Sequence, residues 1–361
     1  MANRPPISEP AGTARPAAAV GRRGEPVTRR RVPTSTAGGG EMRIAWIADG
    51  AAQEATGDAA MGRLPELIAA PGAAVWVDLA SPSPEEVERV GALLGLHPLI
   101  VEDVLEGNQR PKLEQTDGLV HLVIFRLDYD EAVHAIEVDL VLGTGFLLSV
   151  HDRGWDPRTA HHLRRGAGPL LEHGPDHLLW ALCDDIVDAY FPFGDRLGDE
   201  LDRVQDEVVE GIGPEVLRRV FTLKRELHEV RRLISPVREV FNQLTTRDTA
   251  LIDDEELVYF RDVYDHVIRL TDELDNHREL AAATLDVYLT QVNNNLSVIM
   301  KRLTGVTVIV AGVGAVAGIF GMSEAGAALA GGEAIGFWLV TVFTIVGAAV
   351  AAYVLRRIDW I

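Results

Sequence analysis

The sequence predicts an α/β domain followed by a long stalk helix and two C-terminal transmembrane helices. Three observations support this fold class. Strand and helix signals alternate in the first half of the chain, and no Gly or Pro occurs between Pro236 and Gly305. Two uncharged stretches, residues 303–322 and 334–355, lie near the C-terminus. Each has about the 20 residues that a helix needs to cross a bilayer core of ~30 Å.

Residues 1–42 are predicted to be a disordered basic arm. The first 40 residues hold seven Arg against Glu9 and Glu25, and they are otherwise rich in Pro, Gly and Ala. The arm either contacts anionic lipid headgroups or is a solvated tail without a role. It contains no continuous apolar core of the kind that a secretory signal needs.

The composition limits the partners and the compartment. The formal net charge of the 361-residue chain is −20, which argues against nucleic acid as a main partner, because phosphate binding needs a positive surface. The single Cys183 excludes an internal disulfide framework and fits a reducing compartment.

An α/β domain is predicted over residues 43–176. The β-rich run at 73–80 is followed by Ser83, Pro84 and Glu86, which together form the signature of a capping box at a helix start. Two strand-rich segments then flank Gly143-Thr144-Gly145, which we expect to be a hairpin turn.

Helices are predicted from residue 177 onward, with cytoplasmic helices over 177–250 and a stalk helix over 251–302. Val263, Val267, Leu270 and Leu274 repeat at helical spacing. A helix from near Asp253 into the first apolar stretch would have about 68 residues and be roughly 100 Å long. Such a helix cannot bury itself, so it must pack against copies or against other long helices.

The charges around the apolar stretches predict their orientation. Lys301 and Arg302 precede transmembrane helix 1 (303–322), and Arg356 and Arg357 begin the tail (356–361) after transmembrane helix 2 (334–355). The loop at 323–333 has no Lys or Arg. The positive-inside rule therefore predicts cytoplasmic termini and an extracytoplasmic loop. The alternative, a buried hairpin in a soluble core, suits shorter runs of about 10–14 residues.

Two spans per chain cannot enclose a pore, so a polar path through the bilayer would need several subunits in closed symmetry. The first span offers small or weakly polar residues, which either line such a pore or allow close helix packing. They are Thr304, Gly305, Thr307, Gly312, Gly314 and Gly318.

Several motifs in order resemble the CorA metal-ion transporter family, over about residues 76–361. They are "HPLIVEDVLEGNQRPKLE", "ALCDDIVDAYF", "YFRDVYDHVIRLTDEL", "LDVYLTQVNNNLSVIMKRLTG", Gly321-Met322-Ser323 and "YVLRRIDWI". The family closes its first span with Gly-Met-Asn. The resemblance implies a homopentameric funnel in the inner (plasma) membrane, with the long helices as its stalk and inner ring. It also implies inward flux of Mg²⁺, often also Co²⁺ or Ni²⁺, driven by the membrane potential.

The resemblance places the pore along the stalk helix and the first span. Thr304 and Gly318 are added because they are among the small or weakly polar residues of the first span. The expected lining is then Asp286, Asn293, Asn294, Ser297, Leu303, Thr304, Val308, Ala311, Gly314 and Gly318. The expected entrance is Gly321, Met322, Ser323 and Glu324. Ser297 and Ser323 replace Asn of the family, and Ala311 is smaller than the bulky residue expected at the hydrophobic constriction.

The resemblance further implies regulatory divalent ions bound between subunits, which lock the closed state. The matching residues are Asp103 and Asp262, with Glu102 and Asp184 as helpers. Mg²⁺ suits such sites because it keeps much of its water and binds through one or two carboxylates. The alternative is that these are ordinary solvated helix acids. No resident cofactor is expected; Mg²⁺ or another divalent cation is both transported and regulatory.

The histidines do not indicate a structural zinc site. His161, His162, His173 and His177 lie close together and His266 and His277 lie on the stalk, but none has the short ligand spacing of such sites. We expect them to be surface or packing residues.

Three functions remain open from the sequence. They are a Mg²⁺ or Co²⁺ channel, a transporter of the same fold for Zn²⁺ or another transition metal, and a membrane regulatory protein that no longer conducts. An enzyme is not expected, because no nucleotide-binding loop or catalytic constellation stands out.

Overall fold

The computed structural model describes residues 28–30, 40–48, 50–107, 109–130, 132–211, 213–246, 249–321, 333–358 and 360. The chain divides into two compact units. The first comprises Met1–Asp202 and Phe221–Ala281, and the second comprises Arg203–Val220 and Ala282–Ile361. The predicted fold class is confirmed: an α/β region precedes a long helix and two apolar C-terminal helical stretches.

A single sheet forms the centre of the first unit. In the described part of the chain its strands are β1 (Thr28–Arg30), β2 (Glu41–Ala48), β3 (Ala51–Thr56), β4 (Val75–Ala80), β5 (Lys112–Thr116), β6 (Leu119–Asp130), β7 (Ala132–Gly143) and β8 (Phe146–His151). Their order is β3-β2-β4-β8-β7-β6-β5, and β1 pairs with β7. The β4–β8 and β1–β7 pairs are parallel and the others are antiparallel. The predicted hairpin turn at residues 143–145 is confirmed, since Gly143 pairs with Phe146.

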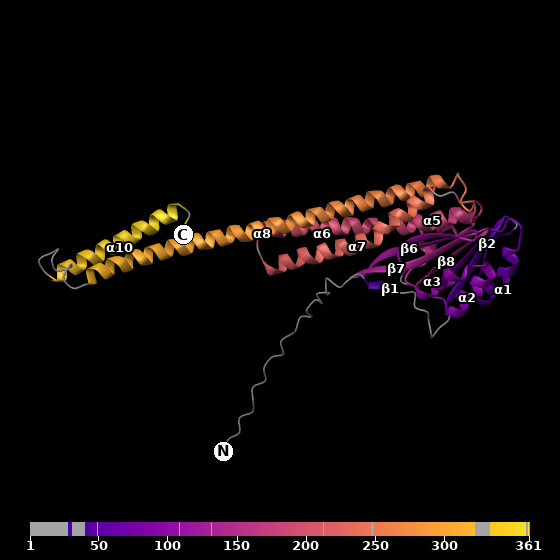
Figure 1. The fold of residues 1–361 in the computed structure, drawn as a ribbon, viewed down its shortest axis with the longest axis horizontal. Helices are drawn as coiled ribbons and strands as arrows, with labels where there is room; N and C mark the ends of the chain where they lie inside the picture. Colours follow the sequence, from indigo (N-terminus) through magenta and orange to yellow (C-terminus); the bar gives the residue numbers. More distant parts are fainter. Residues whose placement is uncertain are drawn as a thin grey trace, which may run out of the picture. The chain divides into compact units, whose positions relative to one another are not determined.

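Helices cover both faces of this sheet, which explains why β4 and β8 are buried along their whole length. Figure 1 shows α1 (Gly57–Ile68), α2 (Pro84–Leu94) and α3 (Pro98–Glu106) on one face, where they pack on β2, β4 and β8. On the other face, α5 (Pro175–Asp188) packs against β6, β7 and β8. A short helix, α4 (Gly168–Leu171), and two 3₁₀ turns, η1 (Pro157–Thr159) and η2 (His161–Arg165), precede α5.

The start of α2 shows the predicted capping box. The Ser83 hydroxyl accepts a hydrogen bond from the Glu86 backbone N–H at 3.2 Å, and the Glu86 carboxylate accepts one from the Ser83 N–H at 2.8 Å. These two bonds satisfy backbone donors that the first helical turn leaves unpaired.

A chain of polar groups crosses the buried interior between β4 and β8. The Trp76 indole N–H donates to the Ser149 hydroxyl at 2.9 Å, and that hydroxyl donates to Asp78 at 2.6 Å. The Nε2 atom of His151 lies 3.0 Å from the same Asp78 oxygen. Burial lowers the pKa of His151, but the hydrogen bond and the charge of Asp78 outweigh it, so the pKa is raised.

Strand β1 is the first difference from the sequence prediction, which treated residues 1–42 as an arm without regular structure. Residues 28–30 pair with His134, Ala135 and Ile136 of β7. Strand β7 is longer than β8, which pairs only with residues 138–143 of β7. On the β8 side, the N-terminal part of β7 therefore has backbone groups that β8 does not satisfy. Residues 28–30 satisfy them.

Three long helices follow the sheet: α6 (Phe191–Glu210), α7 (Pro214–Thr246) and α8 (Leu257–Gly321). In the first unit, Gly194 and Gly198 of α6 face α8, and a Cβ atom on Gly198 would lie only 3.1 Å from the His277 ring. In the second unit, the Gln205 amide of α6 donates to the Thr284 hydroxyl of α8 at 3.2 Å. Close packing therefore continues along the helices in each unit.

The long helix starts at Leu257, later than residue 251 or 253 as predicted. Residues 253–256 form a turn in which the Glu256 N–H donates to the Asp253 carbonyl at 2.9 Å. The Asp253 N–H donates to the Asp176 carboxylate, and the Glu256 carboxylate contacts His177 at 2.7 Å. These tertiary contacts hold the acidic residues outside the helix.

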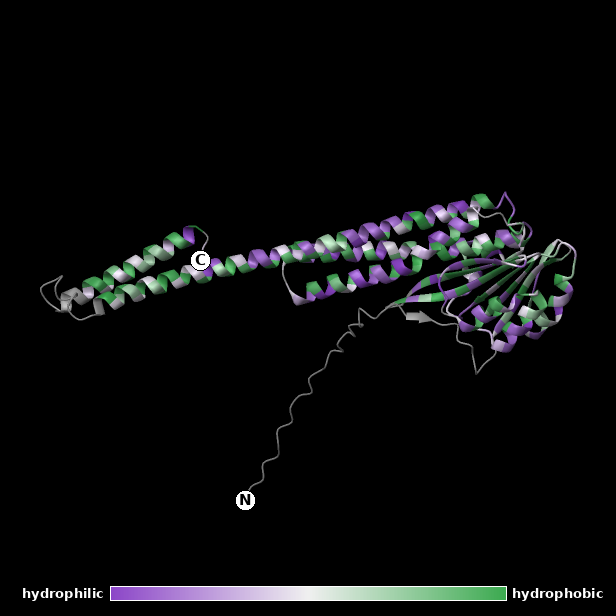
Figure 2. Ribbon diagram, viewed as in Figure 1, coloured by the Kyte–Doolittle hydropathy of each residue, from purple (hydrophilic) through white to green (hydrophobic). Residues whose placement is uncertain are grey.

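The two apolar helical stretches lie in the second unit. The end of α8 and the helix α10 (Glu333–Arg357) appear as the predominantly hydrophobic segments in Figure 2. Both are long and apolar enough to cross a membrane, and only 6% and 0% of their most apolar 18 residues are buried inside the chain. Helix α10 extends one residue before and two residues after the predicted span at 334–355. The predicted loop at 323–333 lies almost entirely outside the described residues.

Candidate metal sites and ion pathway

Asp103 lies on α3 and forms an ion pair with Lys112. The Lys112 ammonium lies 2.5 Å from an Asp103 oxygen and 3.1 Å from an oxygen of Glu114. Burial lowers the pKa of Lys112, but the hydrogen bonds to the two carboxylates outweigh it, so the pKa is raised. Glu102 is exposed on the same helix. This first cluster therefore holds one positive charge between two acids.

Asp184 lies in a second cluster, between α5 and α8. Asp184 and Asp188 are one helical turn apart on α5, and with His266 of α8 they place ligand atoms within 4.8 Å of one another. The His162 ring contacts Asp184 at 2.9 Å. Burial raises the pKa of Asp188, and the charge of Asp184 raises it further, while His266 offsets part of the effect. The carboxylates of this cluster therefore repel each other.

Asp262 joins the second cluster through His266. It precedes His266 by one turn of α8, and its carboxylate lies 3.8 Å from the His266 Nε2 atom. Asp262 is 70% exposed, so it faces solvent at the edge of the cluster. Of the four predicted regulatory residues, the structure thus brings Asp184 and Asp262 to one cluster, whereas Asp103 belongs to the other.

Asp188 and His266 were not among the predicted metal residues. The signal that could have found them is the i, i+4 spacing of Asp184 with Asp188 and of Asp262 with His266, which places each pair on one helix face. The sequence interpretation treated His266 as a surface or packing residue. It does pack, with its ring centroid 5.7 Å from that of Phe191, but it also faces both Asp188 and Asp262.

Other histidines pack around an aromatic group, as the sequence predicted. The ring centroids of His162 and His177 lie 4.7 and 4.9 Å from that of Trp180, and Tyr259 lies 4.7 Å from the same ring. His173 stacks on His177 at 4.9 Å.

The ten residues predicted to line the pore are all exposed on α8. At 3.6 residues per turn, seven of them fall within about 40° of one line along the helix. These seven are Asp286, Asn293, Ser297, Thr304, Val308, Ala311 and Gly318. Asn294, Leu303 and Gly314 lie about a quarter turn to either side. The Ser297 hydroxyl donates to the Asn293 carbonyl at 2.9 Å, which leaves its oxygen lone pairs available to an approaching cation or its waters.

Gly321 is the last residue of α8. Met322, Ser323 and Glu324, the other predicted residues of the entrance, lie outside the described residues.

A protein-family model described as CorA-like Mg²⁺ transporter protein matches residues 71–357. The match includes the sheet from β4 onward, both candidate metal clusters and both apolar helices. The family match thus defines a membrane transport protein and not an enzyme. The chain belongs to the family of CorA-like Mg²⁺ transporters.

Similar proteins agree with this membership. The cobalt/magnesium transport protein CorA of Thermotoga maritima is 37% identical over 243 residues, which cover 66% of this chain and 69% of that protein. The protein of the same name from Methanocaldococcus jannaschii is 26% identical over 291 residues, covering 80% and 91% of the two chains. The complete structure of the M. jannaschii CorA magnesium transporter has the same fold, with a TM-score of 0.73, 24% identity and coverage of 88% of this chain and 98% of that chain.

Proposed function

We propose that the chain forms a channel for divalent cations, with Mg²⁺ as the main substrate and Co²⁺ or Ni²⁺ as further substrates. The observation that carries this proposal is the family match over residues 71–357, which contains both apolar helices and both metal clusters. The Thermotoga and Methanocaldococcus relatives are both cobalt/magnesium transport proteins.

The conducting unit in this proposal is a homopentamer in the inner (plasma) membrane, with cytoplasmic N- and C-termini. The apolar segments of α8 and α10 are almost entirely exposed within one chain, so lipid or other subunits must cover them. Five copies of α8 would surround an axis with the line from Asp286 to Gly318 facing inward. The basic residues Lys301, Arg302, Arg356 and Arg357 at the span ends support the cytoplasmic orientation.

The membrane potential is sufficient as the driving force. A divalent cation gains about 4.6 kcal/mol per 100 mV of negative-inside potential, which is twice the value for one charge. Asn293 and Ser297 would contact the waters of the ion, and Leu303 and Val308 would form a hydrophobic constriction that closes by losing its water. At the entrance, Ser323 offers a shorter polar group than Asn, and Glu324 adds negative charge that concentrates cations.

Cations bound between subunits regulate the channel in this proposal. Asp103 and Asp262 belong to different clusters of the same chain. An ion that bridges Asp103 of one subunit to Asp262 of the next, with help from Glu102 and Asp184, would join the subunits in the closed state. Without the ion, the clustered carboxylates repel one another, which loosens the contact and favours opening.

Ion flux into proteoliposomes tests the proposed function. The full-length protein should take up Mg²⁺ when an inside-negative potential is applied, and protein-free vesicles should not. Co²⁺, Ni²⁺ and Zn²⁺ are then added as competitors. Absence of potential-driven Mg²⁺ uptake, where the Thermotoga relative conducts in parallel vesicles, would contradict the proposal. Preferential Zn²⁺ uptake would assign the chain to a transition-metal substrate instead.

A further inference from the structure

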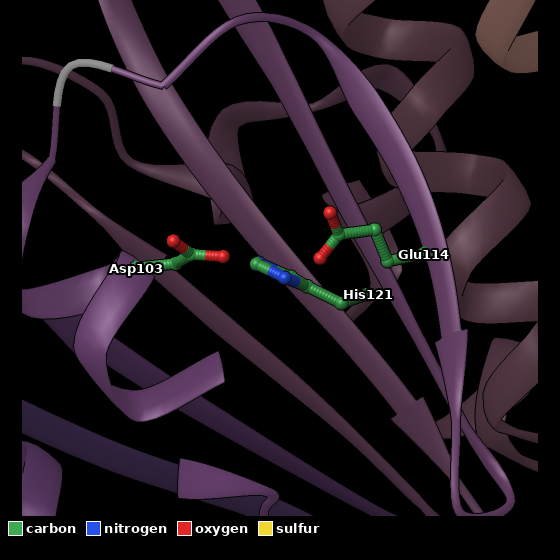
Figure 3. Close-up of side chains that lie close together, drawn as sticks. All are labelled: Asp103, Glu114 and His121. Carbon is green, nitrogen blue, oxygen red and sulfur yellow. The ribbon is translucent and has the colours of Figure 1, made fainter. Parts of the chain in front are cut away.

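The face of the sheet formed by β5, β6 and β7 carries a histidine among acidic residues. Glu114 of β5 and His121 of β6 are directly opposite in the antiparallel register, and Asp139 of β7 lies diagonally from His121. Asp103 of α3 approaches the same face. Figure 3 shows the His121 imidazole between the carboxylates of Asp103 and Glu114. Each of these three residues offers a ligand atom within 4.8 Å of the others.

The imidazole of His121 is oriented by a third carboxylate, that of Asp139. Its Nε2 atom lies 2.9 Å from Asp139, and both side chains are fully buried. A carboxylate accepts hydrogen bonds, so the tautomer that donates from Nε2 to Asp139 has a lone pair on Nδ1. Nδ1 is also buried, and it has no hydrogen-bond partner in the described part of the chain. A buried polar atom without a partner is costly, and a bound cation would satisfy this one.

We propose that Asp103, Glu114 and the Nδ1 atom of His121 form a binding site, within one subunit, for a dication that accepts imidazole, such as Zn²⁺, Co²⁺ or Ni²⁺. Asp139 holds the imidazole in the required orientation, an arrangement that is common around zinc-bound histidines. Mg²⁺ prefers oxygen ligands and octahedral geometry, so it would bind here less well.

The ligand atoms need a modest contraction to bind a metal. Bonds of about 2.0–2.2 Å in tetrahedral geometry separate the ligands by roughly 3.3 Å, whereas the three side chains now each offer one ligand atom within 4.8 Å of the others. The Glu114 side chain is 49% exposed and free to change rotamer, whereas the buried His121 supplies a fixed point. Water would complete the coordination.

Lys112 is the competitor for this site. Its ammonium now lies between the Asp103 and Glu114 carboxylates, at 2.5 and 3.1 Å. A dication must displace that ammonium, which can swing into solvent on its flexible stem. The bound metal would also engage Asp103, the residue that we assign to the contact between subunits. The site itself is defined by metal binding and does not depend on whether the chain conducts.

Zn²⁺ binding to the full-length protein in detergent tests this site. All variants carry His266→Gln, which removes the imidazole from the second acidic cluster, and excess Mg²⁺ occupies sites made of carboxylates alone. The protein that carries His266→Gln alone keeps the proposed site, and we expect it to bind one Zn²⁺ per chain. This binding should be tighter than in any variant that also lacks Asp103, Glu114 or His121. Asp139→Asn should weaken binding by roughly 10–100-fold, the usual effect of losing a partner that orients a ligand. Lys112→Met should tighten binding.

His121→Phe should abolish this binding, together with the imidazole contribution to the X-ray absorption spectrum of bound Zn²⁺. His121→Phe also leaves Asp139 buried without its hydrogen-bond partner, which can destabilise the fold. The more exposed Glu114 and Lys112 therefore test the site without disturbing the interior. Glu114→Gln should weaken Zn²⁺ binding at least about tenfold, and Glu88→Gln, on the exposed side of α2, should have no effect. Unchanged affinity in both Glu114→Gln and Lys112→Met would overturn the proposal.

Discussion

Replacement of Asp188 by Asn tests the repulsion within the second cluster. The Asp184 and Asp188 oxygens are within 4.8 Å of each other, which at an effective dielectric constant of 20 corresponds to about 3.5 kcal/mol of repulsion. Asp188 is 56% exposed, so solvent screening reduces the measurable value to about 1 kcal/mol. Asp188→Asn should therefore stabilise the metal-free protein by about that amount. It should also weaken Mg²⁺ binding if this cluster holds the ion, because the candidate site loses one carboxylate.

Limited proteolysis of the full-length protein in detergent measures both effects. In the absence of divalent ions, the Asp188→Asn protein should be cleaved more slowly than the original protein. The Mg²⁺ concentration for half-maximal protection should rise roughly fivefold, the equivalent of about 1 kcal/mol. Asp254→Asn, at an exposed acid outside the cluster, is the matched control. If the metal-free Asp188→Asn protein is cleaved as fast as the original and its Mg²⁺ dependence is the same, the reasoning is refuted.

Three further predictions concern regulation, stability and the entrance. Asp103→Ala or Asp262→Ala should weaken Mg²⁺ protection against a protease, and full protection in both variants would contradict the regulatory assignment. Since Asp78 raises the pKa of His151 above its ordinary value of 6.5, the stability from this pair is complete below pH 6.5 and is lost as the pH rises through the raised value. Chemical unfolding across that range should show the loss, and His151→Gln should lack it. Ser323→Asn should increase the preference for Mg²⁺ over Co²⁺ in flux competition, because the amide reaches further toward the waters of the ion.

Local features of the fold could be predicted because short-range physics determines them. An uncharged stretch long enough to cross a bilayer identifies α10 to within two residues at either end. The capping box at Ser83 and Glu86 depends on atoms within one turn of helix, and both bonds are present. The long helix follows from the absence of Gly and Pro and from its apolar spacing.

The candidate metal residues were predicted less completely, because a site of this kind joins distant parts of the chain. The motifs pointed to Asp103 and Asp262, with Asp184 as a helper, but the proximity of Asp188 to His266 depends on the packing of α5 against α8. The role of Lys112 as the partner of Asp103 depends in turn on where α3 lies over β5.

The sequence by itself determined the class of protein: two membrane spans, a long helix with small and polar residues along it, and the order of motifs that identifies the family. The tertiary structure decided which charges meet. Strand register placed Glu114 opposite His121, with Asp139 diagonal to His121. Because β7 is longer than β8, residues 28–30 can pair with it. The physical reason is that periodicity and charge act over a few neighbouring residues, whereas register and helix packing join residues that are far apart in the chain and leave no local pattern in the sequence.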